Sequence, residues 1–133
     1  MKVNIIIERA SDGSYSSFMD YDGFDFGLTS AGDSVEEVKC NLYEAYNSMK
    51  ELYKDENRKF HDLEFNFIYD VASFLEYYSK VLTLAGLERI TGVNQGLLSH
   101  YINGRKKPRK ETVEKIEKSL HKFGDELSRV NIV

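Results

Sequence analysis

The sequence has little cysteine and proline, no tryptophan and no long hydrophobic run. Its 133 residues include 1 Cys, 1 Pro and 0 Trp. The lone Cys40 excludes an intrachain disulfide, and no Cys/His cluster has the spacing of zinc ligands. The N-terminal apolar run at 5–7 is far shorter than a signal-peptide core or the roughly 20 residues that span a bilayer. We therefore expect a cytoplasmic protein without membrane contact, disulfide or bound metal.

The motifs of common enzymes are missing as well. No Gly-rich phosphate loop and no Ser/His/Asp or Cys/His arrangement is visible. The carboxylates of Glu8, Asp20 and Glu64 fall at strand ends or at alternate positions, so they do not form the group that two catalytic metal ions need. We expect no catalytic residues and no cofactor, and hence a protein that is not an enzyme.

Charge divides the chain into two parts. The formal net charge is −4. Residues 1–82 contain 16 Asp+Glu and 8 Lys+Arg, whereas residues 83–133 contain 6 Asp+Glu and 10 Lys+Arg. The basic part is typical of a phosphate binder, and the acidic part would be repelled by the same polyanion. Different partners for the two parts are therefore indicated.

The pattern of the first 69 residues predicts a βββαβ module. A hairpin is expected over 2–20 around a turn at Asp12-Gly13, with a third strand at about 24–30. Ser34 and Glu37 form a capping box before a helix whose apolar face extends to Tyr53, and a fourth strand is expected at 63–69. One helix covers one face of such a sheet. The aromatic excess, 9 Tyr and 8 Phe, suggests that the other face packs on another chain or on the second module.

Residues 70–133 predict a second, all-helical module, so the expected fold class is α+β. Short helices follow caps at Asp70 or Ser73, at Thr83 and at Asn94, and Gly92 supplies the turn before the third of them. A last helix follows Pro108. Its apolar residues recur at intervals of three and four, which is typical of either an intrachain core or a dimer contact: Val113, Ile116, Leu120, Phe123, Leu127 and Val130.

The stretch L-E-R-I-T-G-V-N-Q-G-L-L-S-H-Y-I-N-G-R-K-K-P at 87–108 resembles the lambda-repressor-like, or XRE, helix-turn-helix family over roughly residues 71–127. The resemblance implies binding to double-stranded operator DNA, with the helix after Gly92 in the major groove. Two positions depart from the family pattern: Gly96 replaces a polar residue, and Arg109 replaces a Ser or Thr cap. The implied DNA-binding residues are Asn94 as cap and phosphate contact, Gln95, Gly96, Ser99 and His100 toward the bases, and Asn103, Arg105, Lys106 and Lys107 toward phosphates.

The segments I-I-I-E-R-A-S-D-G-S-Y and S-A-G-D-S-V-E-E-V resemble the HicB antitoxin family over about residues 3–53. That family implies a partial RNase H-like fold for the first module, which sequesters a HicA-type RNA-cleaving toxin while the second module represses the shared operon. The acidic balance fits a basic toxin, and the candidate partner-binding residues are Asp20, Asp22 and Asp25. The Pro-Gly that the family carries between strands is missing at 21–25.

Three other interpretations stay open. The chain is a ligand-gated repressor without a toxin partner if the first module holds a sizeable apolar pocket. It is a metal-dependent nuclease if carboxylates such as Asp20 bind Mg²⁺ or Mn²⁺, and an interaction platform if the helical module has lost DNA binding. Because one half-site gives little specificity, a DNA-binding form is expected to be a homodimer or a higher even oligomer.

Overall fold

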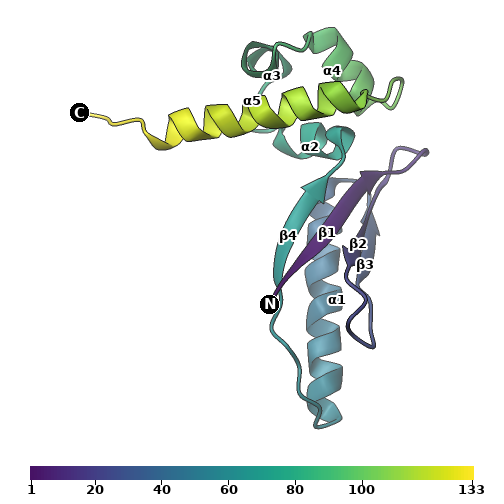
Figure 1. The fold of residues 1–133 in the computed structure, drawn as a ribbon. Coiled ribbons are helices and arrows are strands. Elements are labelled where there is room, and N and C mark those ends of the chain that lie inside the picture. Colours follow the sequence, from purple (N-terminus) through teal and green to yellow (C-terminus); the bar gives the residue numbers. More distant parts are fainter. The chain divides into compact units, whose positions relative to one another are not determined.

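The computed structural model describes all residues 1–133 and has the expected α+β class (Figure 1). Contacts between residues divide the chain into two compact units, Met1–Tyr77 and Tyr78–Val133. The elements are β1 (Lys2–Arg9), β2 (Tyr15–Asp20), β3 (Thr29–Gly32), α1 (Val35–Asp55), β4 (Glu64–Tyr69), α2 (Val71–Tyr78), α3 (Leu84–Thr91), α4 (Gln95–Ile102) and α5 (Lys110–Ser128). Among the five helices there is none with both the length and the apolar character needed to traverse a bilayer.

The first unit is built on a four-stranded sheet in the order β3-β2-β1-β4. β1 pairs antiparallel with β2 through the expected turn, where Gly13 has a φ of 89° and Asp12 Oδ1 accepts from the Ser14 backbone N–H at 2.9 Å. β4 pairs with β1 in parallel, because α1 crosses over between β3 and β4. The sheet is therefore mixed, with β3 and β4 as its two edges.

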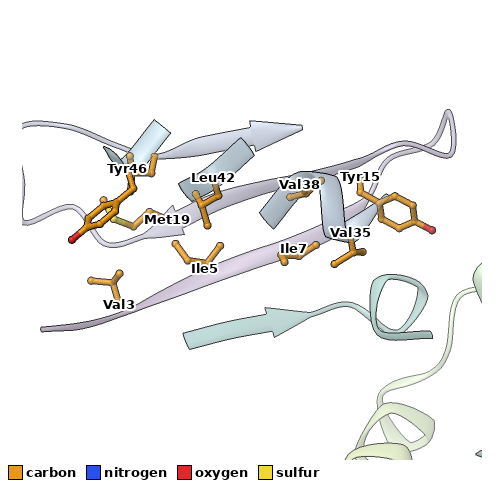
Figure 2. Packing of buried hydrophobic residues seen from close by; sticks show 10 residues of the cluster. Val3, Ile5, Ile7, Tyr15, Met19, Val35, Val38, Leu42 and Tyr46 are labelled. Carbon is orange, nitrogen blue, oxygen red and sulfur yellow. The ribbon is translucent and has the colours of Figure 1, made fainter. Parts of the chain in front are cut away.

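The core of the first unit lies between one face of the sheet and α1. Alternate residues of a strand point to the same face, so Val3, Ile5 and Ile7 of β1 all face the helix (Figure 2). Opposite them, Val38 and Leu42 occupy the apolar stripe of α1 and are fully buried. The helix starts where the sequence predicts, since Ser34 Oγ accepts from the Glu37 backbone N–H at 3.1 Å.

The third strand begins later than the sequence predicts. The sequence predicts a third strand at about 24–30, but β3 starts at Thr29. Phe26 instead packs on Tyr53 and Phe60, with ring centroids 5.7 and 5.6 Å away. These aromatic contacts hold residues 24–26 off the sheet, and pairing with β2 starts only after them.

The second face of the sheet carries an apolar row. Register places Ile6 beside Phe18 and beside Ile68, and Phe18 and Ile68 are each 41% exposed. The aromatic excess is not concentrated on this face, because most Phe and Tyr of the first unit pack against the core on the helix side. That the second face has a partner remains a prediction.

The contact boundary falls at Tyr77–Tyr78, later than the expected 69–70, because α2 belongs with the first unit. The Asp70 carboxylate accepts from the backbone N–H groups of Arg9 at 2.9 Å and Ser73 at 2.8 Å. Glu76 Oε2 accepts from the Val35 backbone N–H at 3.0 Å, which ties α2 to the start of α1. The bonds from Arg9 to Asp70 and from Val35 to Glu76 join segments far apart in sequence, so no local pattern predicts them.

Candidate functional site

α3 and α4 are joined by a tight turn. Gly92 has a φ of 74° and ends α3, since its N–H donates to Glu88 O at 2.7 Å. Thr91 is buried, and its hydroxyl donates to Leu87 O at 2.7 Å and accepts from the Val93 N–H at 3.1 Å. Val93 is also buried. The turn is therefore fixed by backbone geometry and by a fully bonded hydroxyl.

Two side chains satisfy the first backbone donors of α4. Asn94 Oδ1 accepts from the Gly96 N–H at 2.8 Å, as expected of a cap. Glu88, which lies on α3, accepts from the Gln95 N–H through Oε1 at 2.9 Å. This second bond is a charge-assisted link between the two helices, and it leaves the Gln95 side chain exposed at the start of α4.

A glycine at position 96 leaves room for the side chain of the Asn94 cap. A Cβ at this position would lie 2.9 Å from Asn94 Oδ1, closer than real Cβ contacts allow. A larger residue would require the Asn94 side chain, which caps the helix, to shift.

The exposed face of α4 carries the remaining candidate base contacts. Ser99 and His100 follow Gln95 and Gly96 by one turn and are half-buried. Leu98 and Tyr101 lie on the opposite face and are buried. All nine candidate DNA-binding residues therefore belong to α4, its cap and the turn that follows.

That turn concentrates unpaired positive charge. Asn103 ends α4, and Gly104 with a φ of 73° lets the chain reverse. The cations that follow are exposed and have no intrachain ion pair or side-chain hydrogen bond: Arg105, Lys106, Lys107, Arg109 and Lys110. Arg109 occupies the cap position of α5 without a capping side-chain bond. The turn thus has an electrostatic field that no carboxylate of the chain neutralises by direct contact.

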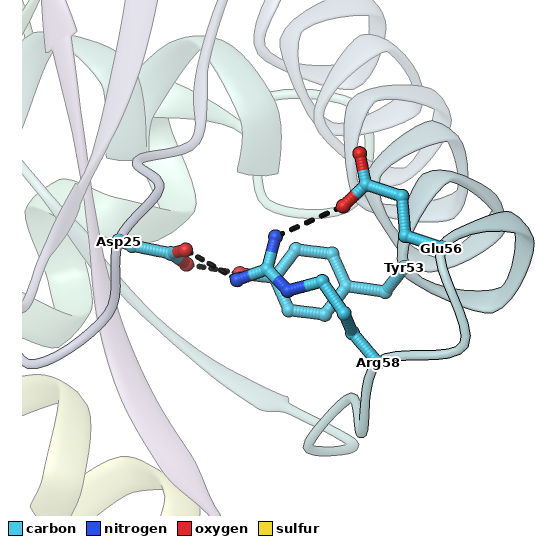
Figure 3. A network of polar contacts seen from close by, with 4 residues as sticks. All are labelled: Asp25, Tyr53, Glu56 and Arg58. Carbon is cyan, nitrogen blue, oxygen red and sulfur yellow. Dashed lines mark hydrogen bonds and ion pairs between the residues drawn. The ribbon is translucent and has the colours of Figure 1, made fainter.

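The three candidate partner-binding acids do not have the same environment. Asp20 and Asp22 are exposed, and their carboxylates accept no hydrogen bond. Asp25, by contrast, accepts from the Tyr53 hydroxyl and from Arg58 Nη2 (Figure 3). Arg58 also donates to Glu56 at 3.1 Å and lies over the Tyr53 ring, 4.1 Å from its centroid. Asp25 therefore connects the 21–28 loop to the end of α1, and only Asp20 and Asp22 are unengaged.

The same contacts shift three pKa values, and that of Arg58 is raised by its bonds to Asp25 and Glu56. Hydrogen bonds from Tyr53 and Arg58 hold the pKa of Asp25 below its usual value, because both donors favour the carboxylate. The bond to Asp25 raises the pKa of the Tyr53 hydroxyl. In α1, burial lowers the pKa of Lys39, whose ammonium lies 3.8 Å from the Tyr77 ring centroid and 4.4 Å from that of Phe67.

The nuclease and the ligand-gated interpretations each require a binding site. No group of three His, Cys, Asp or Glu lies close enough together to hold a metal ion. An open groove of about 570 Å³ borders the end of α1 and is lined by Asn47, Lys50, Glu51, Lys54, Arg58 and Phe60.

Comparisons with known proteins found no relative. No family model matches the chain. No curated protein matches it. No solved structure matches it either.

Proposed function

We propose that the chain is an antitoxin and transcription repressor of the HicB type, acting in the cytoplasm. In this proposal the second unit is an XRE-like helix-turn-helix that binds operator DNA, and the first is a partial RNase H-like module that sequesters a HicA-type toxin. The observation that carries it is the α3–α4 pair with its doubly satisfied helix start, followed by a turn of exposed cations without ion pairs. No catalytic residue or cofactor takes part.

The geometry of α4 supports the DNA side of the proposal. Gln95 is exposed at the helix start, so its amide can donate to and accept from a base edge in the major groove. Asn94 Oδ1 is occupied by the Gly96 N–H, so its amide NH₂ is the group that would reach a phosphate. Lys107 and its neighbours would bind phosphates and release counterions, which sets the register without reading sequence.

The proposed binding of a toxin is argued from the acidic charge of the first part of the chain. Residues 1–82 contain 16 Asp+Glu against 8 Lys+Arg. A toxin that cleaves RNA needs a basic surface, so an acidic partner would approach it quickly and cover the surface that RNA needs. Asp20, at the end of β2, and Asp22, in the loop that follows, are exposed acids available for this contact.

The test is fluorescence anisotropy on DNA from immediately upstream of the gene, at low and physiological salt. Gln95→Ala should weaken binding to the best sequence by about 1–3 kcal/mol and relax preference at one base pair. Lys107→Ala should weaken all sequences alike and flatten the salt dependence. The control is Lys54→Ala, since Lys54 is an exposed lysine of the first unit without an ion pair. Equal behaviour of the Gln95 and Lys107 variants would contradict the assigned roles.

The toxin is tested in the same assay by adding the product of the adjacent small reading frame. A change in DNA affinity on addition supports the antitoxin-repressor proposal, and Asp20→Lys with Asp22→Lys should then abolish the effect. DNA binding that is indifferent to the neighbour's product would leave a repressor without a toxin partner. Absence of DNA binding would leave an interaction platform.

A further inference from the structure

Glu88 places a negative charge at the start of α4, the helix that the proposed function turns toward DNA. It lies on α3 and is half-buried, and its Oε1 accepts from the Gln95 backbone N–H at 2.9 Å. No Lys or Arg of the chain forms an ion pair with it. The charge of this carboxylate is therefore not neutralised by direct contact with a cation of the chain.

The start of a helix is the place where a backbone attracts anions. The first N–H groups have no partner within the helix, and the helix dipole adds partial positive charge there. Phosphates of DNA bind such N–H groups. In α4, however, the Gln95 N–H donates to Glu88, and the Gly96 N–H donates to Asn94 Oδ1 at 2.8 Å. The first two backbone donors of α4 are thus already occupied by the chain itself.

The two acceptors differ in origin and in charge. Asn94 is the neutral cap that directly precedes α4. Glu88 lies seven residues before Gln95 on the preceding helix, so its contact is created by the arrangement of α3 and α4. A carboxylate oxygen, like a phosphate oxygen, is an anionic acceptor for an N–H group. Glu88 therefore stands where a phosphate oxygen would bind, while the Gln95 side chain stays exposed.

We propose that Glu88 excludes DNA phosphates from the backbone at the start of α4, and that it is a specificity-determining residue of the DNA-binding site. Gln95 then contributes to binding through its side chain and a base, not through its N–H and a phosphate. The phosphate contact of Asn94 is confined to its side-chain NH₂, since its Oδ1 is bonded to Gly96. This inference rests on the proposed function, because it requires that α4 faces DNA.

The mobility of the complex decides which DNA would gain from an open helix start. The exposed cations that follow α4 attract phosphates of any sequence, and complexes held by phosphates alone slide along DNA. On unrelated DNA the start of α4 can therefore turn toward a phosphate. On the operator, the contact of Gln95 with its base holds the helix start at a base edge. Removal of Glu88 should thus strengthen binding to unrelated DNA more than binding to the operator.

The first experiment compares the operator with an unrelated duplex by fluorescence anisotropy over a salt series. In Glu88→Ala, affinity for unrelated DNA should rise severalfold, and the slope of log affinity against log salt should steepen by about 0.9, the contribution of one more phosphate. The preference for the operator should fall. Glu88→Gln keeps an acceptor for the Gln95 N–H without the charge, so it should strengthen binding to both duplexes alike and preserve the preference.

The matched control is Glu126→Ala on α5. Glu126 is an exposed acid of the same unit, and its side chain makes no ion pair or hydrogen bond. The variant loses the same charge as Glu88→Ala but opens no backbone donor. Its salt slope and its preference for the operator should equal those of wild type.

The second experiment needs no DNA. Inorganic phosphate is titrated into the full chain while the Gln95 and Gly96 amides are followed by NMR. The Gln95 amide should shift along a saturating curve in Glu88→Ala and should not respond in wild type or in Glu88→Gln. A Gln95 amide that ignores phosphate in Glu88→Ala, or an unchanged salt slope when that variant binds DNA, would overturn the inference. Phosphate binding by Glu88→Ala together with a wild type that binds no DNA at low salt would keep the exclusion of anions by Glu88 and refute the proposed function.

Discussion

Glu88 is the residue whose removal tests most directly how the start of α4 is held. It lies on α3, and its Oε1 accepts from the backbone N–H of Gln95 at 2.9 Å. In Glu88→Ala this N–H loses its protein partner, while the Asn94 cap of the Gly96 N–H remains. The change therefore loosens one end of α4 and its link to α3 without touching the core.

The magnitude follows from the kind of bond. A hydrogen bond to a charged group contributes about 1.5–3 kcal/mol, and the half-exposed position of Glu88 places this one at the low end. We expect about 1–2 kcal/mol, which is a factor of roughly 5 to 30 in a local opening equilibrium.

The assay is amide hydrogen exchange resolved by residue. In Glu88→Ala the Gln95 amide should exchange about 5 to 30 times faster, and its neighbours in the first turn of α4 should follow more weakly. Glu88→Gln keeps an acceptor without the charge and should lose less protection. Glu114→Ala on α5 is the control, because the Glu114 side chain is exposed and makes no hydrogen bond. Unchanged exchange at Gln95 in Glu88→Ala would refute the reasoning.

Two further changes address the first unit and can be measured by urea unfolding at several pH values. Asp25→Asn should lower stability at neutral pH, because the folded pKa of Asp25 is below its unfolded value of 3.8. The carboxylate's contribution to stability is present above that value and is lost as pH falls through the folded pKa, so wild type and variant should converge in acid. A constant difference between them would contradict the role of the bonds from Tyr53 and Arg58 to Asp25. Ser73→Ala should raise stability by about 1 kcal/mol, since the buried Ser73 hydroxyl has no hydrogen-bond partner, and a lower unfolding midpoint would show that the hydroxyl is satisfied.

The elements that sequence predicts well are those defined by local signals. Ser34, Thr83 and Asn94 each accept from a backbone N–H two or three residues further on, so caps and helix starts agree with expectation. Gly92 likewise marks its turn through a positive φ that depends on one residue. Because cause and effect lie within one turn, a single sequence is enough to find them.

The candidate site was only partly predictable, because several of its contacts join residues from different elements. Gln95 was expected to be exposed on α4, but the acceptor of its backbone N–H is Glu88, on the preceding helix. Asp25 was expected to be free for a partner, yet it is held by Tyr53 and Arg58. The sequence does not show whether a carboxylate faces solvent, contacts a partner or binds its own chain. The fold decides this, because it brings other segments of the chain next to the carboxylate.

The apolar seam of α5 shows what periodicity alone leaves undecided. Intervals of three and four residues predict an apolar face, but they are the same for an intrachain core and for a contact between chains. Burial differs along this one helix, because Ile116 is covered within its own unit whereas Val113 and Leu127 are exposed. The repeat of three and four residues therefore marks an apolar face, and only the fold shows how much of that face the unit covers.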